Sequence, residues 1–279
     1  MKKFNHFITE QELMQNTAED LMEKLITFGG KAYPKFGNIV VMAGGAGSGK
    51  GFVLNKLVGV EGKVFDVDEL KRLASKTPAI KKRVQKELGV DIEALGKDLK
   101  NPENVSKLHD IIANFLGADK GKERMFYRSV LTSPADRKPN IIFDMTFKEL
   151  SKLEKVANDA SKLGYDKKNI HIVWVVNDIE VAKAQNLTRD RTVPAEILVN
   201  THRGASQTMA DIVNMGKTLK RYMDGDIVFA FNKIGVDSEL KVSGNDGSFL
   251  KDAKYFYAKK AGKAATPVAQ MQKDIVAKI

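Results

Sequence analysis

The feature that most constrains the fold is a short apolar run followed at once by a glycine-rich loop. Residues 38–43, NIVVMA, are β-branched and apolar on both faces, and GGAGSGK at 44–50 follows directly. Such a run is typical of a central parallel strand that helices cover on both sides of a sheet. The residues after the loop, GKGFVLNKLVG, predict the start of a helix. We therefore expect a buried strand, a tight loop and a helix in that order.

Further apolar runs alternate with helical segments along the rest of the chain. We predict strands at 63–67, 140–145, 169–176 and 226–231. Strands that alternate with helices indicate a right-handed parallel α/β sheet whose site lies at the carboxyl ends of the strands. The main domain is expected over residues 11–235.

Three segments lie outside this alternation. Apolar residues at helical spacing predict a helix from Glu12 to about Thr27, before Gly29. The span 72–136 is longer than a crossover needs, so we expect a helical insertion that forms a wall on the substrate side. Past Ser243 the pattern weakens, and residues 236–279 are expected to be a loosely attached, basic C-terminal extension.

The loop satisfies the spacing G-x-x-x-x-G-K through Gly44, Gly49 and Lys50. In a strand–loop–helix setting, glycines let successive backbone N–H groups turn inward around a β-phosphate, and the lysine reaches the β- and γ-phosphate oxygens. The alternative is a structural glycine turn with a solvated Lys50. We predict a nucleotide site, with ATP as the ligand, made by Gly44, Gly45, Ala46, Gly47, Ser48, Gly49, Lys50 and Gly51.

Gly51 stands where such loops usually have the serine or threonine that binds magnesium, and Phe52 offers no hydroxyl either. This departure puts direct coordination of Mg²⁺ in doubt but leaves phosphate binding intact. Magnesium often keeps several of its waters, so carboxylates elsewhere in the chain could hold Mg²⁺ through water.

Two carboxylates, Asp66 and Asp68, follow the second predicted strand. They are two residues apart, so both point to the same face, toward the loop. A carboxylate there could accept the proton of an attacking hydroxyl during phosphoryl transfer. Equally, Asp68 could be the N-cap of the helix ELKRLA. Asp66 is the candidate for water-mediated magnesium binding.

The order of these motifs resembles the zeta toxin and polynucleotide kinase group of P-loop kinases. The resemblance spans roughly residues 38–205 and rests on the loop, on D-x-D-x-x-K at 66–71, on IIFDMTF and on NLTRDRTVPAEIL. It implies a P-loop NTPase fold of the kinase type. By position it makes Asp68 the catalytic base, Lys71 and Asp144 residues of the substrate side, and Arg189 and Arg191 lid arginines that act with Lys50 on the phosphates. Without the resemblance, the two arginines fit an exposed charged turn.

This resemblance implies ATP-dependent transfer of the γ-phosphate to a hydroxyl. Two acceptor classes fit, a nucleotide-sugar and a nucleic-acid 5′-hydroxyl. The net charge of +11 favours anionic partners and leans only slightly toward the second. Of the dispersed histidines, only His202, which follows the arginine segment, is placed to touch a nucleotide.

The first ten residues, MKKFNHFITE, resemble the capsid-targeting leader of internal head proteins of large tailed bacteriophages, in which cleavage would follow Glu10. An ordinary N-terminal helix fits the same residues. The leader would place the protein in the virion, whereas a kinase of this group would act in the cytoplasm of the host cell. A packaged, DNA-associated protein with a degenerate nucleotide site is therefore the alternative function.

Composition excludes several other classes of protein. The chain has no cysteine, so it holds no disulfide framework and no cysteine zinc site. No apolar run approaches the roughly 18 residues of a membrane span, so no membrane association is expected.

Overall fold

The computed structural model describes residues 26–31, 34–65, 75–116, 130–188, 192–232, 254–267 and 269–271. Residues 1–10 and most of the helix predicted from Glu12 lie outside this part of the chain. The last two residues of that helix, Ile26 and Thr27, are not helical, because Ile26 forms a β-bridge with Val58.

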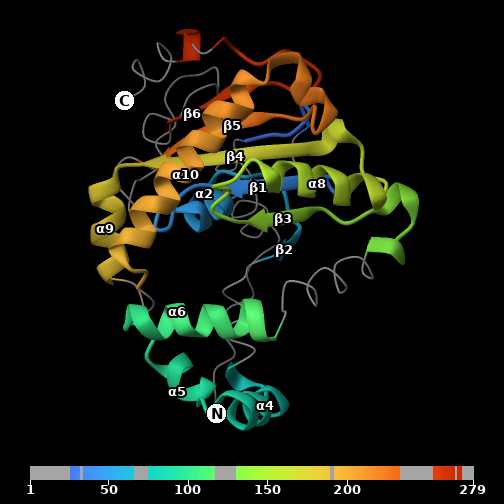
Figure 1. Cartoon of the computed structure of the whole chain (residues 1–279). Helices are drawn as coiled ribbons and strands as arrows, with labels where there is room; N and C mark the ends of the chain where they lie inside the picture. The colour runs from blue at the N-terminus through green and yellow to red at the C-terminus, as the bar shows by residue number, and fades with distance from the viewer. Residues whose placement is uncertain are drawn as a thin grey trace, which may run out of the picture.

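A six-stranded sheet in the order β2-β3-β1-β4-β5-β6 forms the centre of the molecule (Figure 1). Strands β1 to β5 are parallel, and β6 pairs antiparallel with β5. The strands are β1 (Ile39–Ala43), β2 (Lys63–Phe65), β3 (Ile141–Asp144), β4 (Ile170–Asn177), β5 (Ile227–Asn232) and β6 (Lys254–Lys259). All five strands predicted from apolar runs are confirmed, and so is the α/β class.

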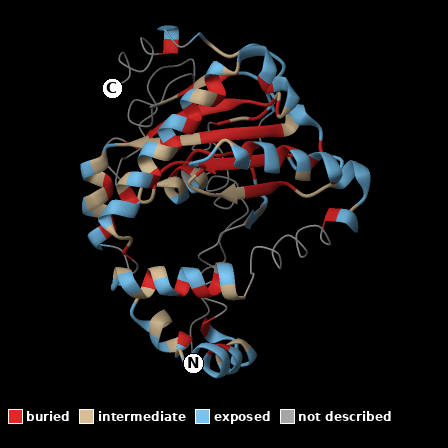
Figure 2. Ribbon diagram, viewed as in Figure 1, coloured by how far each residue is buried: buried red, intermediate tan, exposed pale blue. Residues whose placement is uncertain are grey.

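Helices bury both faces of the sheet, which explains why β1 is apolar at every position (Figures 1 and 2). Alternate residues of β1 belong to two different core clusters. One face packs against α8 (Ser151–Lys162) and α10 (Ala195–Asn214), and the other packs against α2 (Lys50–Lys56). α9 (Ile179–Thr188) follows β4. The carboxyl ends of β1, β3 and β4 therefore meet where the glycine-rich loop begins.

Strand β6 corrects the expectation of a loosely attached C-terminal extension for residues 254–259. Its main chain pairs with β5 from Ile227 to Phe231, and its Phe256 and Ala258 are buried in the same core as α8 and α10. In the sequence KYFYAK, the buried Phe256 and Ala258 alternate with Tyr255 and Tyr257, which are partly buried against the second core cluster. The flanking lysines concealed this alternation in the sequence.

The insertion contains a separate group of short helices, drawn below the sheet in Figure 1. They are α4 (Pro78–Leu88), α5 (Ile92–Lys97), α6 (Pro102–Asp110) and a π-helical turn, η1 (Ile111–Phe115). Asp91 and Asn101 cap α5 and α6 through their side chains. These helices, the helical unit below, have a small core of their own. Thr192 joins the helical unit to the sheet domain, because its N–H donates to Leu99 O at 3.0 Å and its hydroxyl donates to Lys100 O.

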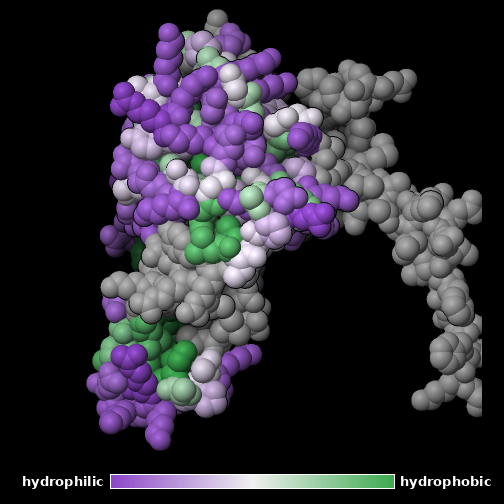
Figure 3. All heavy atoms as spheres, turned by 90° about the vertical axis from the view of Figure 1, so that its right-hand side faces the viewer, coloured by the Kyte–Doolittle hydropathy of each residue, from purple (hydrophilic) through white to green (hydrophobic). Residues whose placement is uncertain are grey.

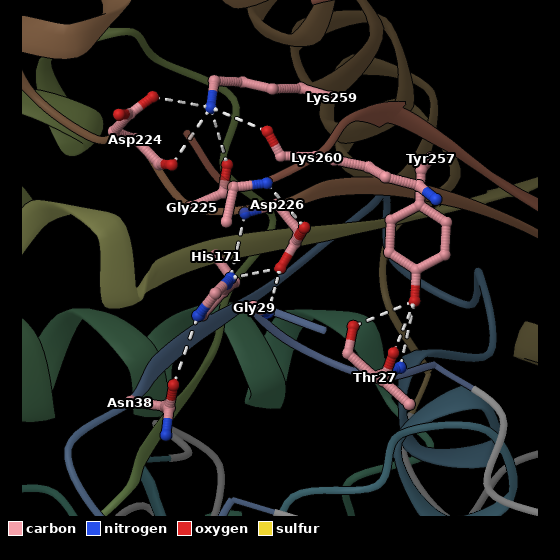
Figure 4. A network of polar contacts seen from close by, with 11 residues as sticks. Thr27, Gly29, Asn38, His171, Asp224, Gly225, Asp226, Tyr257, Lys259 and Lys260 are labelled. Atoms are coloured by element: carbon pink, nitrogen blue, oxygen red, sulfur yellow. Dashed lines mark hydrogen bonds and ion pairs between the residues drawn. The ribbon is translucent and has the colours of Figure 1, made fainter. Parts of the chain in front are cut away.

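A buried polar network holds the amino-terminal ends of β4 and β5 together (Figure 4). His171 is fully buried; its Nδ1 lies 2.9 Å from Asp226 N and 3.0 Å from Asp226 Oδ2, and its Nε2 lies 3.3 Å from Asn38 Oδ1. Asp226 therefore contacts one ring nitrogen through both its main chain and its carboxylate. Burial opposes the charge on Asp226, but hydrogen bonds from His171, Gly29 and Ala261 outweigh burial and lower its pKa.

No helix among the described residues is long and apolar enough to cross a membrane.

The buried histidine makes stability depend on pH. Burial lowers the pKa of His171, and the interaction with Asp226 offsets this only in part. The unfolded chain titrates near pH 6.5, so it binds more protons there than the folded chain does. The free energy of unfolding is therefore highest above about pH 6.5 and falls below it, by at most about 1.4 kcal/mol per pH unit for each such group. His202 contributes in the same direction, because burial lowers its pKa too.

Urea unfolding between neutral and mildly acidic pH measures this dependence. We expect His171→Gln to be less stable at neutral pH and to lose stability less steeply on acidification. His109→Gln, on the exposed side of α6, should keep the wild-type slope. An unchanged slope in His171→Gln would show that the folded protein does not hold this ring neutral.

Candidate functional site

The glycine-rich loop connects the central strand β1 to α2 at the carboxyl edge of the sheet. Three of its glycines have a positive φ, of 145° at Gly44, 75° at Gly47 and 88° at Gly49. Gly49 is the N-cap of α2, and the first bond of that helix runs from the Val53 N–H to Gly49 O. The N–H groups that precede this bond have no acceptor within the helix, so they are directed toward the loop.

Side chains are excluded from the loop by close neighbours as well as by φ. A Cβ at Gly49 would lie 2.2 Å from Asn232 Nδ2, and one at Gly44 would lie 2.7 Å from Val175 O. At Gly45 the ring of His202 lies within 2.1 Å of the same position. At Gly44 and Gly49 a positive φ and close neighbours both disfavour a side chain, and at Gly45 the His202 ring occupies the space.

Polar side chains from distant segments hold the loop in shape. Asn177, at the end of β4, donates to Gly47 O at 3.2 Å, and Asn232, at the end of β5, donates to Ser48 O at 3.1 Å. From α10, Thr201 Oγ1 accepts from the Ala46 N–H at 3.1 Å.

Apart from His202, these supports were not identified from the sequence. The asparagines at the ends of two predicted strands were the available signal, because parallel strands end at the same edge of a sheet. Thr201 gave no signal, since it lies inside a helix that is far from the loop in sequence.

His202 was expected to touch a nucleotide, and the structure places it against the loop itself. Its Nε2 lies 2.8 Å from Ala46 O, and Ala46 is therefore held through both its N–H and its carbonyl by consecutive residues of α10. Burial lowers the pKa of His202, the hydrogen bond to Ala46 raises it, and the charge of Lys50 lowers it further. The ring is therefore uncharged at neutral pH and donates from Nε2.

Lys50 lies over the loop and beside a carboxylate. Its Nζ donates to Gly44 O at 3.0 Å and to Gly45 O at 3.3 Å, and it lies 3.7 Å from Asp144 Oδ1. Asp144 ends β3, which is the immediate neighbour of β1, and it pairs in register with Met42. Lys50 was expected on the ATP phosphates and Asp144 on the substrate side. In the structure the two side chains lie together at the loop.

Gly51 is exposed, and a Cβ built on it would meet no atom within 4 Å. Its φ is not positive. The absence of a hydroxyl at this position is therefore not imposed by space or by backbone conformation, and serine would fit there.

The donor set suits phosphate better than it suits a directly bound metal ion. Ser48 Oγ and Asn177 Oδ1 are buried beside the loop without a hydrogen-bond partner; the hydroxyl can donate to a phosphate oxygen or to water, whereas the amide oxygen can only accept, as from water. Within the described residues, no group of three or more His, Cys, Asp or Glu side chains could hold a metal ion. The predicted residues Asp66, Asp68, Lys71, Arg189 and Arg191 lie outside the described part of the chain.

The assembled geometry brings glycines, a helix start and one lysine to a single place. Positive-φ glycines, the start of α2 and Lys50 converge at the end of a buried strand, which is the arrangement that cradles phosphates in nucleotide-binding proteins.

The sequence matches no protein-family model and no curated protein sequence. Among solved structures, similarity is found to a chain of the PezAT chromosomal toxin–antitoxin system of Streptococcus pneumoniae. That chain is 14% identical, with a TM-score of 0.36, and the match covers 82% of this chain and 79% of that one.

A second similarity is to the AvrRxo1-ORF1:AvrRxo1-ORF2 complex with ATP. It is 9% identical, with a TM-score of 0.45 and coverage of 95% of this chain and 70% of that one. The same complex with sulphate ions gives 10% identity, a TM-score of 0.43 and coverage of 95% and 70%. Likenesses this distant say nothing about substrate or partner.

Proposed function

We propose that this chain is an ATP-dependent phosphotransferase that transfers the γ-phosphate to a hydroxyl group. The observation that carries the proposal is the loop at the end of β1, where Gly44, Gly47 and Gly49 have a positive φ and Lys50 lies beside Asp144. The motif order that resembles the zeta toxin and polynucleotide kinase group supports a kinase over other uses of such a loop.

The loop residues 44–51 bind the triphosphate in this proposal. Backbone N–H groups and Lys50 contact the phosphate oxygens. When the nucleotide binds, Lys50 Nζ replaces its hydrogen bonds to Gly44 O and Gly45 O with bonds to the phosphate. His202 and Thr201 keep the loop open by holding Ala46. Their contribution is preorganisation, because a cradle that is already formed costs no rearrangement when charge develops on the phosphate.

Magnesium would neutralise charge on the β- and γ-phosphate oxygens. Asp144 is the carboxylate that the structure places next to Lys50, so we assign it to holding the hydrated ion rather than the acceptor. Asp66 is the second candidate for this role. Binding of magnesium through water agrees with the absence of a hydroxyl at Gly51. It also agrees with the reluctance of Mg²⁺ to lose its bound waters.

The acceptor side is assigned on the resemblance. Asp68 would take the proton of the attacking hydroxyl, Lys71 would contact the acceptor, and Arg189 with Arg191 would stabilise the transferring phosphoryl group. Thr192 bonds to Leu99 O and Lys100 O, so Thr192 lies against the helical unit. We infer that the helical unit forms the wall on the acceptor side, with a nucleotide-sugar or a nucleic-acid 5′-hydroxyl as acceptor.

Transfer of labelled γ-phosphate from Mg-ATP tests this function. The acceptor panel contains UDP-N-acetylglucosamine, 5′-hydroxyl oligonucleotides and nucleosides. We expect a labelled product from one class, and a loss of about 100-fold or more in Lys50→Ala, because charge stabilisation at the transferring group is removed. Lys152→Ala, an exposed lysine on α8, is the matched control and should behave as wild type.

Equal transfer by Lys50→Ala and wild type would refute the site. ATP binding without transfer to any acceptor would instead favour the alternative, a packaged DNA-associated protein whose nucleotide site is degenerate.

The same assay, run across magnesium concentrations, tests the water-mediated arrangement. In Gly51→Ser a hydroxyl becomes available at the usual ligand position, and the open surroundings of Gly51 accommodate it. We expect Gly51→Ser to need about three- to tenfold less magnesium for half-maximal transfer, since a hydroxyl replaces one water in the ion's shell. Gly51→Ala should match wild type. If serine and alanine behave alike, the ion is not bound next to position 51.

A further inference from the structure

The edge of the sheet opposite the loop is a second surface with a defined construction. Four turns converge there: residues 28–31, η3 (Lys167–Asn169), the segment from η4 (Gly216–Arg221) to β5, and the turn at 260–263 after β6. We call this the amino-edge surface, because it lies at the amino-terminal ends of β4 and β5.

Asp224 and Asp226 join these turns. The Asp224 N–H donates to Lys167 O at 2.8 Å, and Asp224 O accepts from the Gly262 N–H at 2.9 Å. The Asp226 carboxylate accepts from the N–H groups of Gly29, at 2.6 Å, and Ala261, at 2.8 Å. Residues 224–226 belong to one of the four turns and bond to the other three. The positions of the four turns relative to each other are therefore fixed.

At this edge Asp226 is buried and Asp224 is largely covered, whereas Asp166 is exposed and ion-paired. Asp226 is buried against His171, and Asp224 Oδ1 accepts from the buried Lys259 at 2.9 Å (Figure 4). Asp224 also pairs with Lys220 at 3.7 Å, and Asp166 pairs with Lys168 at 3.2 Å. The carboxylates of Asp224 and Asp166 are therefore paired with lysines, and that of Asp226 is bound by main-chain N–H groups.

The positive charges point outward. Exposed basic side chains that form no ion pair within the described residues come from all four turns: Lys31, Lys167, Lys217, Arg221, Lys260 and Lys263. Figure 3 views the molecule from this side, and the part that belongs to the sheet domain is mostly hydrophilic. The result is a rigid surface with excess positive charge in a chain whose net charge is +11.

We propose that the amino-edge surface binds the phosphate backbone of duplex DNA without sequence preference. Duplex DNA carries a charge about every 1.7 Å along its axis, so several separated cations can be matched at once. Single strands are usually bound by stacking on exposed aromatic rings. Two tyrosines near this surface are tethered instead: Tyr222 bonds to Glu154, and Tyr257 bonds to Thr27 beneath Lys260. Phe36, whose neighbour Gly37 lies beside η3, is an exposed ring, but one ring cannot stack a run of successive bases.

This proposal stands apart from the phosphotransferase. Parallel strands β4 and β5 separate the amino-edge surface from the loop, which lies at their other ends. DNA held here does not occupy the loop, so ATP and DNA can bind at the same time.

The test measures binding of a short duplex with phosphorylated 5′ ends, so that no end can act as an acceptor, by fluorescence anisotropy across salt concentrations. The variant is Lys167→Gln, Lys217→Gln, Arg221→Gln and Lys263→Gln combined. The control removes the same charge from α8, α9 and the residue Lys148 before α8: Lys148→Gln, Lys152→Gln, Lys155→Gln and Lys183→Gln, whose side chains are accessible in wild type. Circular dichroism and thermal unfolding confirm that both variants are folded.

We expect the amino-edge variant to bind at least about tenfold more weakly at low salt. Its slope of log affinity against log salt should fall by up to about 3.6, since each lost phosphate contact removes about 0.9. The control variant should lose much less, and excess ATP should leave DNA binding unchanged.

Three results would each overturn the proposal. Equal losses in the two variants would mean that diffuse charge, rather than this surface, attracts DNA. Competition by ATP would place the DNA at the loop. Binding to vesicles of phosphatidylserine and phosphatidylcholine, without binding to DNA, would identify a lipid headgroup as the anion.

Discussion

The burial of β1 on both faces is the constraint on which the rest of the structure depends. A strand with no polar position has to lie at the centre of the sheet, between β3 and β4, and below helices on each side. Its carboxyl end then opens where the neighbouring strands also end. The glycine-rich loop forms at that place, so Asp144 from β3 and Asn177 from β4 lie beside it.

The loop and the sheet depend on each other. Gly47, Ser48 and Ala46 are held by β4, β5 and α10, so the cradle exists only when these elements are in place. At the other end of the same strands, His171 and Asp226 lock β4 to β5. One end of the sheet thus holds the glycine-rich loop with Lys50, and the other carries exposed lysine and arginine side chains.

Much of the fold could be predicted because the parallel strands are short, apolar and bounded by polar residues. The loop could be predicted for the same reason, since its motif lies between such a strand and a helix. β6 could not, because partly buried tyrosines alternate with its buried residues, so the alternation is weak, and lysines surround it. Thr201 could not be found either: it reaches the loop across 155 residues, and no local pattern records such a contact. Asp68, Lys71 and the two arginines stay predictions.

The most direct test of the cradle is a calorimetric titration of ATP into wild type and two alanine variants of the loop. Gly49→Ala adds a Cβ at a positive φ, 2.2 Å from Asn232 Nδ2, whereas Gly51→Ala adds one in open space. We expect wild type and Gly51→Ala to bind ATP equally, and Gly49→Ala, folded by circular dichroism, to bind at least about tenfold more weakly, since a strained loop cannot present its N–H groups. Undiminished ATP binding by Gly49→Ala, or none by wild type, would contradict a phosphate cradle at this loop.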